Sequence, residues 1–191
     1  PVMPDFAIVF AVTGMDETER GLRKRVTAFL VDVGTDGFDI SEGTRSVSYR
    51  GYLTFQLGFS DVRLGPDQIL GEEGRGLELS GKWLSMNRIW VGASCCGKAE
   101  RLFALAAEWA ANRKQFGQPI GNFQATGFKL ADMAVELKAA DLLVMDAVAK
   151  GDQGKMTDSD AAMVKLFCSE MLNRSADHTV QIYGGMGLME E

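Results

Sequence analysis

The chain has 191 residues, of which 46% are hydrophobic and 24% are charged, and its formal net charge is −6. This composition is ordinary for a globular protein and excludes a disordered chain. The negative charge argues against nucleic acid as the main partner. No apolar run is long enough to span a membrane and no signal peptide opens the sequence, which favours a soluble, cytoplasmic protein.

Residues 1–70 are predicted to form strands of an antiparallel sheet. Residues 6–13 form an apolar run rich in β-forming residues, which predicts a buried strand. The charged run at residues 15–25 is expected to be an exposed hairpin connection between strands. Further strands are predicted at residues 26–33, 38–41 and 51–64, the last with the alternation of a half-buried strand.

Composition changes after Gly76, and three long helices are predicted from there onward. Apolar residues then recur every three or four positions, which is the spacing of one helix face. The predicted helices cover residues 77–113, 122–150 and about 158–183, with Thr157 or Asp158 as the cap of the third. Such helices pack antiparallel in an up-down bundle.

The predicted fold class is therefore α+β. Residues 1–70 are assigned to part of an antiparallel β-barrel or sandwich domain, and residues 71–191 to a helical bundle domain that is incomplete at its C-terminal end. Three helices lack the fourth face that a bundle needs to bury its seam, and the chain begins within a sheet. Both observations predict a fragment of a longer polypeptide.

Cysteine and histidine usage bears on two classes of site. Cys95, Cys96 and Cys168 are odd in number and do not form a disulfide framework, which suits a reducing compartment. We expect them to be small core or helix-contact residues rather than nucleophiles. His178 is the only histidine and no Cys-x-x-Cys pair occurs, so no metal site is predicted.

Residues 113–124 separate the first two predicted helices and are unlike a helix in composition. Gly117 and Pro119 interrupt any helical pattern. In one interpretation, Arg113 offsets the partial negative charge of a helix C-terminus and Phe116 caps the core. In the other, this loop binds a ligand.

Four motifs occur in a fixed order along nearly the whole chain. They are Phe59-Ser-Asp-Val-Arg, Leu70-Gly-Glu-Glu-Gly-Arg-Gly, Arg113-Lys-Gln-Phe-Gly-Gln-Pro-Ile with Phe123-Gln124, and Gln181-Ile-Tyr-Gly-Gly-Met-Gly187. In this order they resemble the acyl-CoA dehydrogenase family. The resemblance implies a helical domain and more sheet before Pro1, and one or two further helices after Glu191.

The resemblance implies that FAD is clasped across a subunit interface, so that the active form is a homodimer or homotetramer. The implied cofactor-binding residues are Arg113, Gln115, Phe116, Gln124, Gln181, Ile182, Tyr183, Gly184 and Gly185. An arginine matches pyrophosphate oxygens with paired hydrogen bonds, and consecutive glycines let backbone amides approach a dinucleotide. A plain helix C-cap is the alternative interpretation of the two glycines.

The resemblance also implies that Ser85 and Arg88 contact an acyl-CoA substrate. Asn87 stands where some relatives carry the catalytic carboxylate, and an amide cannot act as a base. The base is therefore expected beyond Glu191, and no residue of this chain is assigned as catalytic. Glu190 and Glu191 match a structural glutamate of the family.

The implied activity is α,β-dehydrogenation of an acyl-CoA thioester. A carboxylate removes the α-proton while the β-hydrogen leaves as hydride to the flavin. An electron-transfer flavoprotein is the implied electron acceptor, and this fragment alone is expected to be inactive. The alternatives are a flavin oxidase or flavin-dependent monooxygenase component of the same fold, or a non-enzymatic helical scaffold.

Overall fold

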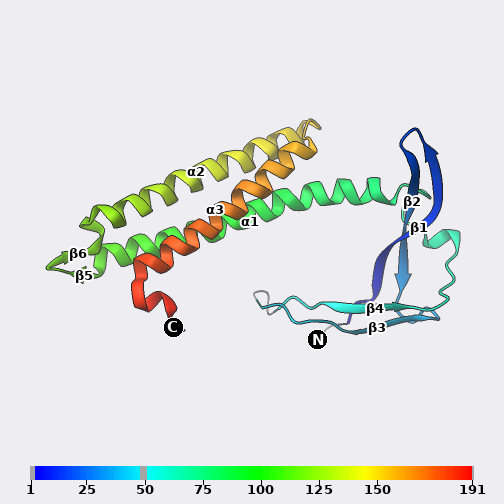
Figure 1. Cartoon of the computed structure of the whole chain (residues 1–191), viewed down its shortest axis with the longest axis horizontal. Coiled ribbons are helices and arrows are strands. Elements are labelled where there is room, and N and C mark those ends of the chain that lie inside the picture. Colours follow the sequence, from blue (N-terminus) through cyan, green and yellow to red (C-terminus); the bar gives the residue numbers. More distant parts are fainter. Residues whose placement is uncertain (1–2, 48–50, 191) are drawn as a thin grey trace. The chain divides into compact units, whose positions relative to one another are not determined.

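The computed structural model describes residues 3–47 and 51–190 of the chain. The chain divides into two compact units, Pro1–Lys82 and Trp83–Glu191, and the boundary falls inside a long helix. In the described residues, antiparallel strands precede long helices (Figure 1), which confirms the predicted α+β organisation. The domain boundary between residues 70 and 71 stays a prediction.

β1 (Phe6–Thr18) and β2 (Gly21–Asp32) form an antiparallel hairpin. The charged run at residues 15–25 is exposed and contains the hairpin turn, as expected, but both strands continue through it and turn only at residues 19–20. Ladder hydrogen bonds come from the backbone, so charged side chains are tolerated wherever a strand face is exposed. The charged side chains therefore did not indicate where the pairing of β1 with β2 ends.

The expectation that residues 6–13 are buried is also wrong for the described chain. Apolar side chains on one face of β1 are 45–50% exposed, and these are Phe6, Ile8, Phe10 and Val12. Among the described residues β1 pairs with β2 alone, and these apolar side chains stay about half exposed. The buried positions of the hairpin lie on β2 instead, at Thr27, Ala28 and Val31.

β2 anchors the segment that leads into the first helix. The backbone N–H of Leu70 donates to the carbonyl of Ala28 at 2.8 Å, and the N–H of Gly74 donates to the hydroxyl of Thr27 at 2.8 Å. A short 3₁₀ helix, η1 (Pro66–Gln68), precedes these contacts. The chain thus enters the helix from a fixed position on the hairpin.

β3 (Phe38–Glu42) and β4 (Phe55–Phe59) form a second antiparallel pair, in which the rings of Phe38 and Phe59 stack with centroids 4.9 Å apart. The strand predicted at residues 51–64 is therefore much shorter than expected. β3 ends at Glu42 and offers a partner to only five residues of β4.

The helices are α1 (Gly76–Asn112), α2 (Gln124–Asp152) and α3 (Asp158–Tyr183). Their ends agree with the predicted ranges to within two residues. α2 and α3 run beside each other along the second unit (Figure 1). No helix in the described residues is both long enough and apolar enough to cross a membrane.

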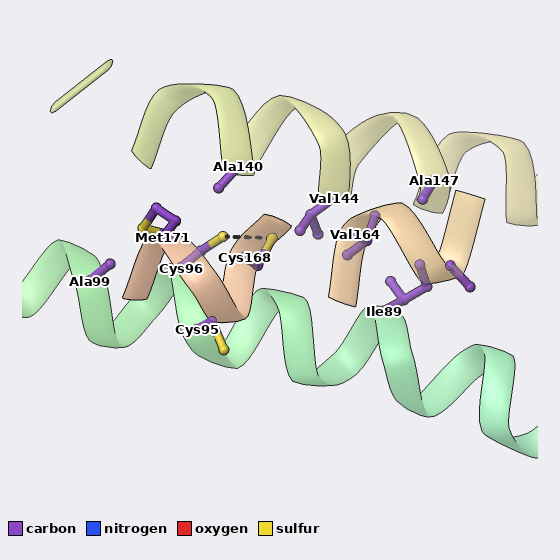
Figure 2. Close-up of a cluster of buried hydrophobic side chains, with 11 residues drawn as sticks. Ile89, Cys95, Cys96, Ala99, Ala140, Val144, Ala147, Val164, Cys168 and Met171 are labelled. Carbon is purple, nitrogen blue, oxygen red and sulfur yellow. Dashed lines mark hydrogen bonds between the residues drawn. The ribbon is translucent and has the colours of Figure 1, made fainter. Parts of the chain in front are cut away.

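Small side chains from all three helices form the larger core (Figure 2). Its members are Ile89, Cys95, Cys96, Ala99, Ala140, Val144, Ala147, Ala161, Val164, Cys168 and Met171. The three cysteines are buried and free, as predicted. The Sγ atoms of Cys96 and Cys168 lie 4.0 Å apart, and burial raises the pKa of the Cys96 thiol to about 12. These thiols are packing groups rather than nucleophiles.

A second cluster lies toward the end of α1. It contains Ala106, Ala110, Met133 and Ile182, with Phe103, Trp109, Ile120 and Leu130 packed against it. This cluster joins the last turns of α1 and α3 to the segment between α1 and α2. It therefore places the predicted cofactor-binding segments on one end of the bundle.

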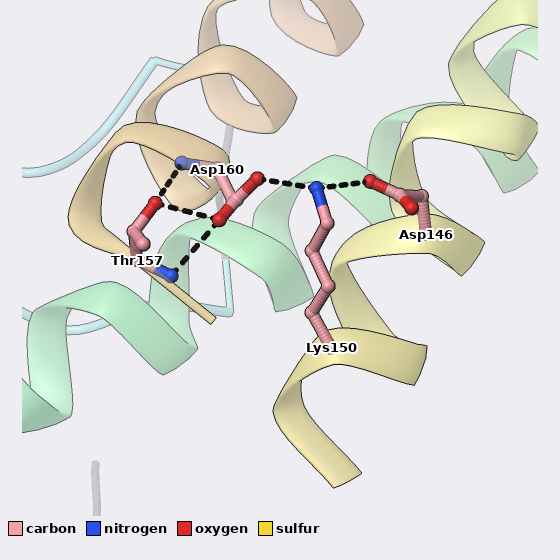
Figure 3. A network of polar contacts seen from close by, with 4 residues as sticks. All are labelled: Asp146, Lys150, Thr157 and Asp160. Carbon is pink, nitrogen blue, oxygen red and sulfur yellow. Dashed lines mark hydrogen bonds and ion pairs between the residues drawn. The ribbon is translucent and has the colours of Figure 1, made fainter. Parts of the chain in front are cut away.

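A polar network joins the end of α2 to the start of α3 (Figure 3). Thr157 caps α3: its hydroxyl accepts from the N–H of Asp160 at 3.2 Å, and the Asp160 carboxylate accepts from the N–H of Thr157 at 2.9 Å. The ammonium of Lys150 lies 2.6 Å from Asp146 and 2.8 Å from Asp160. The hydrogen bonds from Lys150 and Thr157 hold the pKa of Asp160 well below its usual range.

Gly92→Ala tests the close approach of the helices. An added Cβ at Gly92 would collide with Cγ1 of Val164 and lie 3.5 Å from the sulfur of Cys168. Overpacking costs about 1–3 kcal/mol, and so severe a collision with a stiff valine lies toward the upper end, above the roughly 1 kcal/mol that alanine gains over glycine in a helix. We expect a lower urea-unfolding midpoint.

The matched control is Gly97→Ala in the same helix, where an added Cβ meets nothing within 4 Å. This variant is expected to gain roughly 0.5–1 kcal/mol. Equal stabilisation by both substitutions would contradict the close packing at Gly92.

Asp160→Asn tests the polar network through its pH dependence. Because the folded-state pKa of Asp160 is lowered, its stabilising contribution is complete above its ordinary pKa of 3.8 and is lost as the pH falls below that value. We expect the variant to be less stable than the wild type at pH 7, with a difference that shrinks below pH of about 4. Urea unfolding at several pH values measures this difference.

Asp146→Asn is the matched control, because Asp146 pairs with the same lysine but its side chain is 59% exposed, against 11% for Asp160. Exposed ion pairs contribute little to stability. A loss as large as that of Asp160→Asn would contradict the assigned role of burial.

Candidate cofactor-binding site

The segment between α1 and α2 is a small hairpin. β5 (Lys114–Gln115) pairs with β6 (Gln118–Pro119), and the N–H of Ile120 donates to the carbonyl of Arg113 at 2.8 Å. Phe116 and Gly117 form the turn with φ angles of +51° and +81°, which are the signs of a type I′ turn. The prediction that the α-helical pattern is interrupted here is confirmed, but the hairpin and the short 3₁₀ helix η2 (Ile120–Asn122) that follows it were not foreseen.

Phe116 projects outward from the tip of this hairpin and is 93% exposed. The interpretation in which Phe116 caps the core is therefore wrong for the described chain. Its ring meets Phe123 edge-on with centroids 6.2 Å apart. A bulky residue at positive φ is strained, and such strain is concentrated at binding sites. The hairpin thus holds a large apolar ring away from the bundle.

An aromatic stack links the hairpin to the end of α3. The guanidinium carbon of Arg113 lies 5.8 Å from the centroid of the Trp109 ring, within the range of a cation–π interaction. Trp109 in turn stacks on Tyr183, with centroids 4.6 Å apart and ring planes 10° from parallel. Trp109 is not among the site residues predicted from the sequence. Its four-residue spacing from Arg113 is the signal that could have revealed the contact.

The glycine turn follows directly after this stack. Gly184 caps α3 with φ +63° and ψ −136°, and its N–H donates to the carbonyls of Val180 and Gln181. The plain C-cap interpretation therefore describes the role of Gly184 in the helix. An added Cβ at Gly184 or Gly185 would meet nothing within 4 Å, so the backbone here is open to a ligand. The chain continues in η3 (Gly184–Leu188).

The other predicted cofactor-binding residues differ in exposure. Gln115, Gln124 and Gln181 have exposed side chains, although the Gln115 amide donates to the carbonyl of Lys114 at 2.8 Å. Ile182 is 6% exposed and lies in the second core cluster. Only the backbone of Ile182 is therefore available for a cofactor contact.

The predicted substrate-binding residues lie in the first third of α1. Ser85 is buried, and its hydroxyl donates to the carboxylate of Asp158 at 2.5 Å. Arg88 is half-buried and has no ion-pair partner among the described residues, and Asn87 is also half-buried. Twenty-five helical residues separate Arg88 from Arg113, which is about 38 Å along α1. The chain does not bring these two sets together.

The chemistry at the hairpin end fits a pyrophosphate group. Arg113 is exposed and has no ion-pair partner in the described part of the chain, so its charge is available to an anion. Exposed amide side chains add neutral hydrogen-bond donors, and the open space at Gly184 and Gly185 lets a ligand approach the backbone. Of the glutamates near this turn, Glu190 is exposed and Glu191 lies outside the described residues.

These features define a helical bundle with an exposed arginine and an open glycine turn at one end. The family model for "Acyl-CoA dehydrogenase, C-terminal domain" matches residues 74–191. The chain belongs to the acyl-CoA dehydrogenase family.

Three similar proteins illustrate the relationship. The short-chain specific acyl-CoA dehydrogenase of Megasphaera elsdenii is 38% identical over 187 residues, covering 98% of this chain and 48% of that protein. The CarC subunit of the caffeyl-CoA reductase-Etf complex of Acetobacterium woodii is 34% identical over the same shares. A solved structure of PigA with FAD and proline has a TM-score of 0.88 and 30% identity, and the match covers 97% of this chain and 47% of that chain. The chain thus spans about half the length of the curated relatives it matches.

Phe116→Asn tests the strained turn. Asparagine is favoured before glycine in type I′ turns, so relief of the strain is expected to stabilise the hairpin by about 1 kcal/mol. Hydrogen exchange of the Ile120 amide, which bonds across the hairpin, measures this local stability. We expect slower exchange in the variant.

Gly117→Ala is the opposing control, since the φ of +81° disfavours any side chain. It is expected to speed exchange of the same amide. Faster exchange in Phe116→Asn as well would contradict the assignment of strain to Phe116.

Proposed function

We propose that the whole protein is an FAD-dependent acyl-CoA dehydrogenase and that this chain supplies its clasp for the FAD pyrophosphate. The observation that carries the proposal is the exposed Arg113, which has no ion-pair partner among the described residues and is linked through Trp109 and Tyr183 to the open glycine turn. Membership of the acyl-CoA dehydrogenase family supports it. So does the similarity to a protein whose structure contains FAD.

In the proposed clasp, the guanidinium of Arg113 pairs with pyrophosphate oxygens. Gln115, Gln124 and Gln181 donate amide hydrogen bonds, and the backbone of residues 182–185 approaches the dinucleotide. Phe116 covers the cofactor from the hairpin tip, which gives a reason for holding its ring outward. Tyr183 contributes through its backbone because its ring is stacked on Trp109.

When bound, FAD supplies the acceptor for the hydride that leaves the β-carbon of an acyl thioester. We propose that Arg88 contacts the acyl-CoA through its unpaired charge. Ser85 can only accept a hydrogen bond from the substrate, because its hydroxyl already donates to the carboxylate of Asp158. Asn87 offers no basic group, so we propose a base outside residues 1–191.

The proposed active form is a homodimer or homotetramer. Arg88 on α1 and Arg113 just after its end are too far apart to serve one active centre, so the clasp would hold the FAD of a second subunit. The exposed face of α2 carries apolar side chains seven residues apart, at Phe128, Val135 and Leu142, which suits a helix interface. An electron-transfer flavoprotein is the proposed electron acceptor, because one relative is a subunit of an Etf complex. A cytoplasmic location stays a prediction.

The experiment that tests this function uses the full-length protein. We expect it to purify with FAD and to lose its absorbance near 450 nm when a short-chain acyl-CoA is added without oxygen. In Arg113→Gln, loss of a charge-assisted pair worth about 1.5–3 kcal/mol is expected to weaken FAD binding by roughly 10- to 150-fold. The affinity for FAD is measured from the fluorescence of the FAD that dissociates from the protein.

Lys114→Gln is the matched control, since it removes the same charge from the next residue of the hairpin. It is expected to leave FAD affinity within about twofold of the wild type, because an exposed charge outside the clasp contributes little. Equal losses in both variants would refute a specific role for Arg113. Rapid production of hydrogen peroxide from acyl-CoA would favour the oxidase alternative.

A further inference from the structure

We propose that Trp109 is a positioning residue that holds the guanidinium of Arg113 in place for the pyrophosphate. This inference rests on the proposed function of Arg113 as a phosphate ligand. It assigns a role to a residue on α1 that makes no contact with the cofactor itself.

Hydrogen bonds fix the backbone of Arg113, but among the described residues no ion pair restrains its side chain. Its N–H donates to the carbonyl of Trp109 at 2.8 Å, and its own carbonyl accepts from Ile120 at 2.8 Å. In the described residues no carboxylate pairs with the guanidinium. A free arginine side chain samples many rotamers, and ordering it on binding weakens affinity. A neighbouring group that restrains it without neutralising its charge would therefore strengthen binding.

Trp109 has the geometry of such a group. It lies one helical turn before Arg113, so the two side chains share a face, and the guanidinium carbon is 5.8 Å from the ring centroid. A cation–π contact leaves the hydrogen-bond donors of arginine unused. The guanidinium can therefore rest near the indole and still present its N–H groups to a phosphate.

Trp109 is itself held in one orientation by the end of α3. It packs against the second core cluster and stacks on Tyr183 with nearly parallel rings. The hydroxyl of Tyr183 donates to the carbonyl of Leu105, one turn before Trp109, at 3.4 Å. Tyr183 directly precedes Gly184, so one stack sets both the direction of Arg113 and the start of the glycine turn.

A double-mutant cycle on the full-length protein separates positioning from simple packing. We expect Trp109→Leu to weaken FAD binding by about three- to tenfold, because leucine fills space but offers no ring face. Trp109→Phe keeps an aromatic face and is expected to stay within about twofold of the wild type. With Arg113 already replaced by Gln, Trp109→Leu is expected to cause no further loss.

Losses that add in the double variant, or equal losses from Trp109→Leu and Trp109→Phe, would overturn the inference. If the wild type binds FAD and Arg113→Gln binds it equally well, the positioning role falls while a flavin-dependent function stands. If the wild type binds no FAD, both fall.

A second measurement needs no cofactor. Near-ultraviolet circular dichroism of the FAD-free protein is expected to show the coupled signal of stacked rings. This signal should be lost in Trp109→Leu and in Tyr183→Leu but kept in Arg113→Gln. Loss of the signal in Arg113→Gln would mean that the arginine holds the stack, which reverses the proposed dependence and overturns it.

Discussion

The close packing of α1 against α3 is the constraint on which the rest of the helical unit depends. Gly92 lets the helices approach so closely that a single methyl group there would strike Val164. Small residues continue this contact along α1, at Cys96, Ala99 and Ala106, which are all nearly fully buried. A second contact joins the same two helices near their C-terminal ends, where the ring of Trp109 stacks on Tyr183. The arrangement of the cofactor-binding end depends on this second contact.

The helices could be predicted from the sequence because their signals are local. Apolar residues at helical spacing, the Thr157 cap and the Gly184 terminator placed all three helices to within two residues. The strands were less predictable because pairing depends on a partner. β1 and β2 run through a charged segment that a single-strand pattern excludes, and β4 is short because β3 ends early. Burial of β1 was predicted from its apolar run, but in the described chain the apolar side chains on one face of β1 are about half exposed.

The candidate site could be predicted as a set of residue types but not as an arrangement. The sequence motifs identify Arg113 and the glycine turn. The outward position of Phe116 could not be predicted, because it depends on a two-residue turn in which Phe116 and Gly117 both have positive φ. Trp109 was missed because an apolar residue at helical spacing is usually core, and its second role needs a residue on another helix. The burial of Ile182 and the pairing of Ser85 with Asp158 likewise depend on contacts between distant segments.

The buried cysteines of the larger core can report on the opening of the helical bundle. Cys96 and Cys168 are shielded from solvent, and burial raises the pKa of both thiols. Alkylating reagents attack the thiolate and need access to the sulfur. In the folded bundle both conditions fail together, and both are restored when the helices separate. The rate at which these two native thiols are labelled therefore measures how often the bundle opens, and no probe has to be introduced.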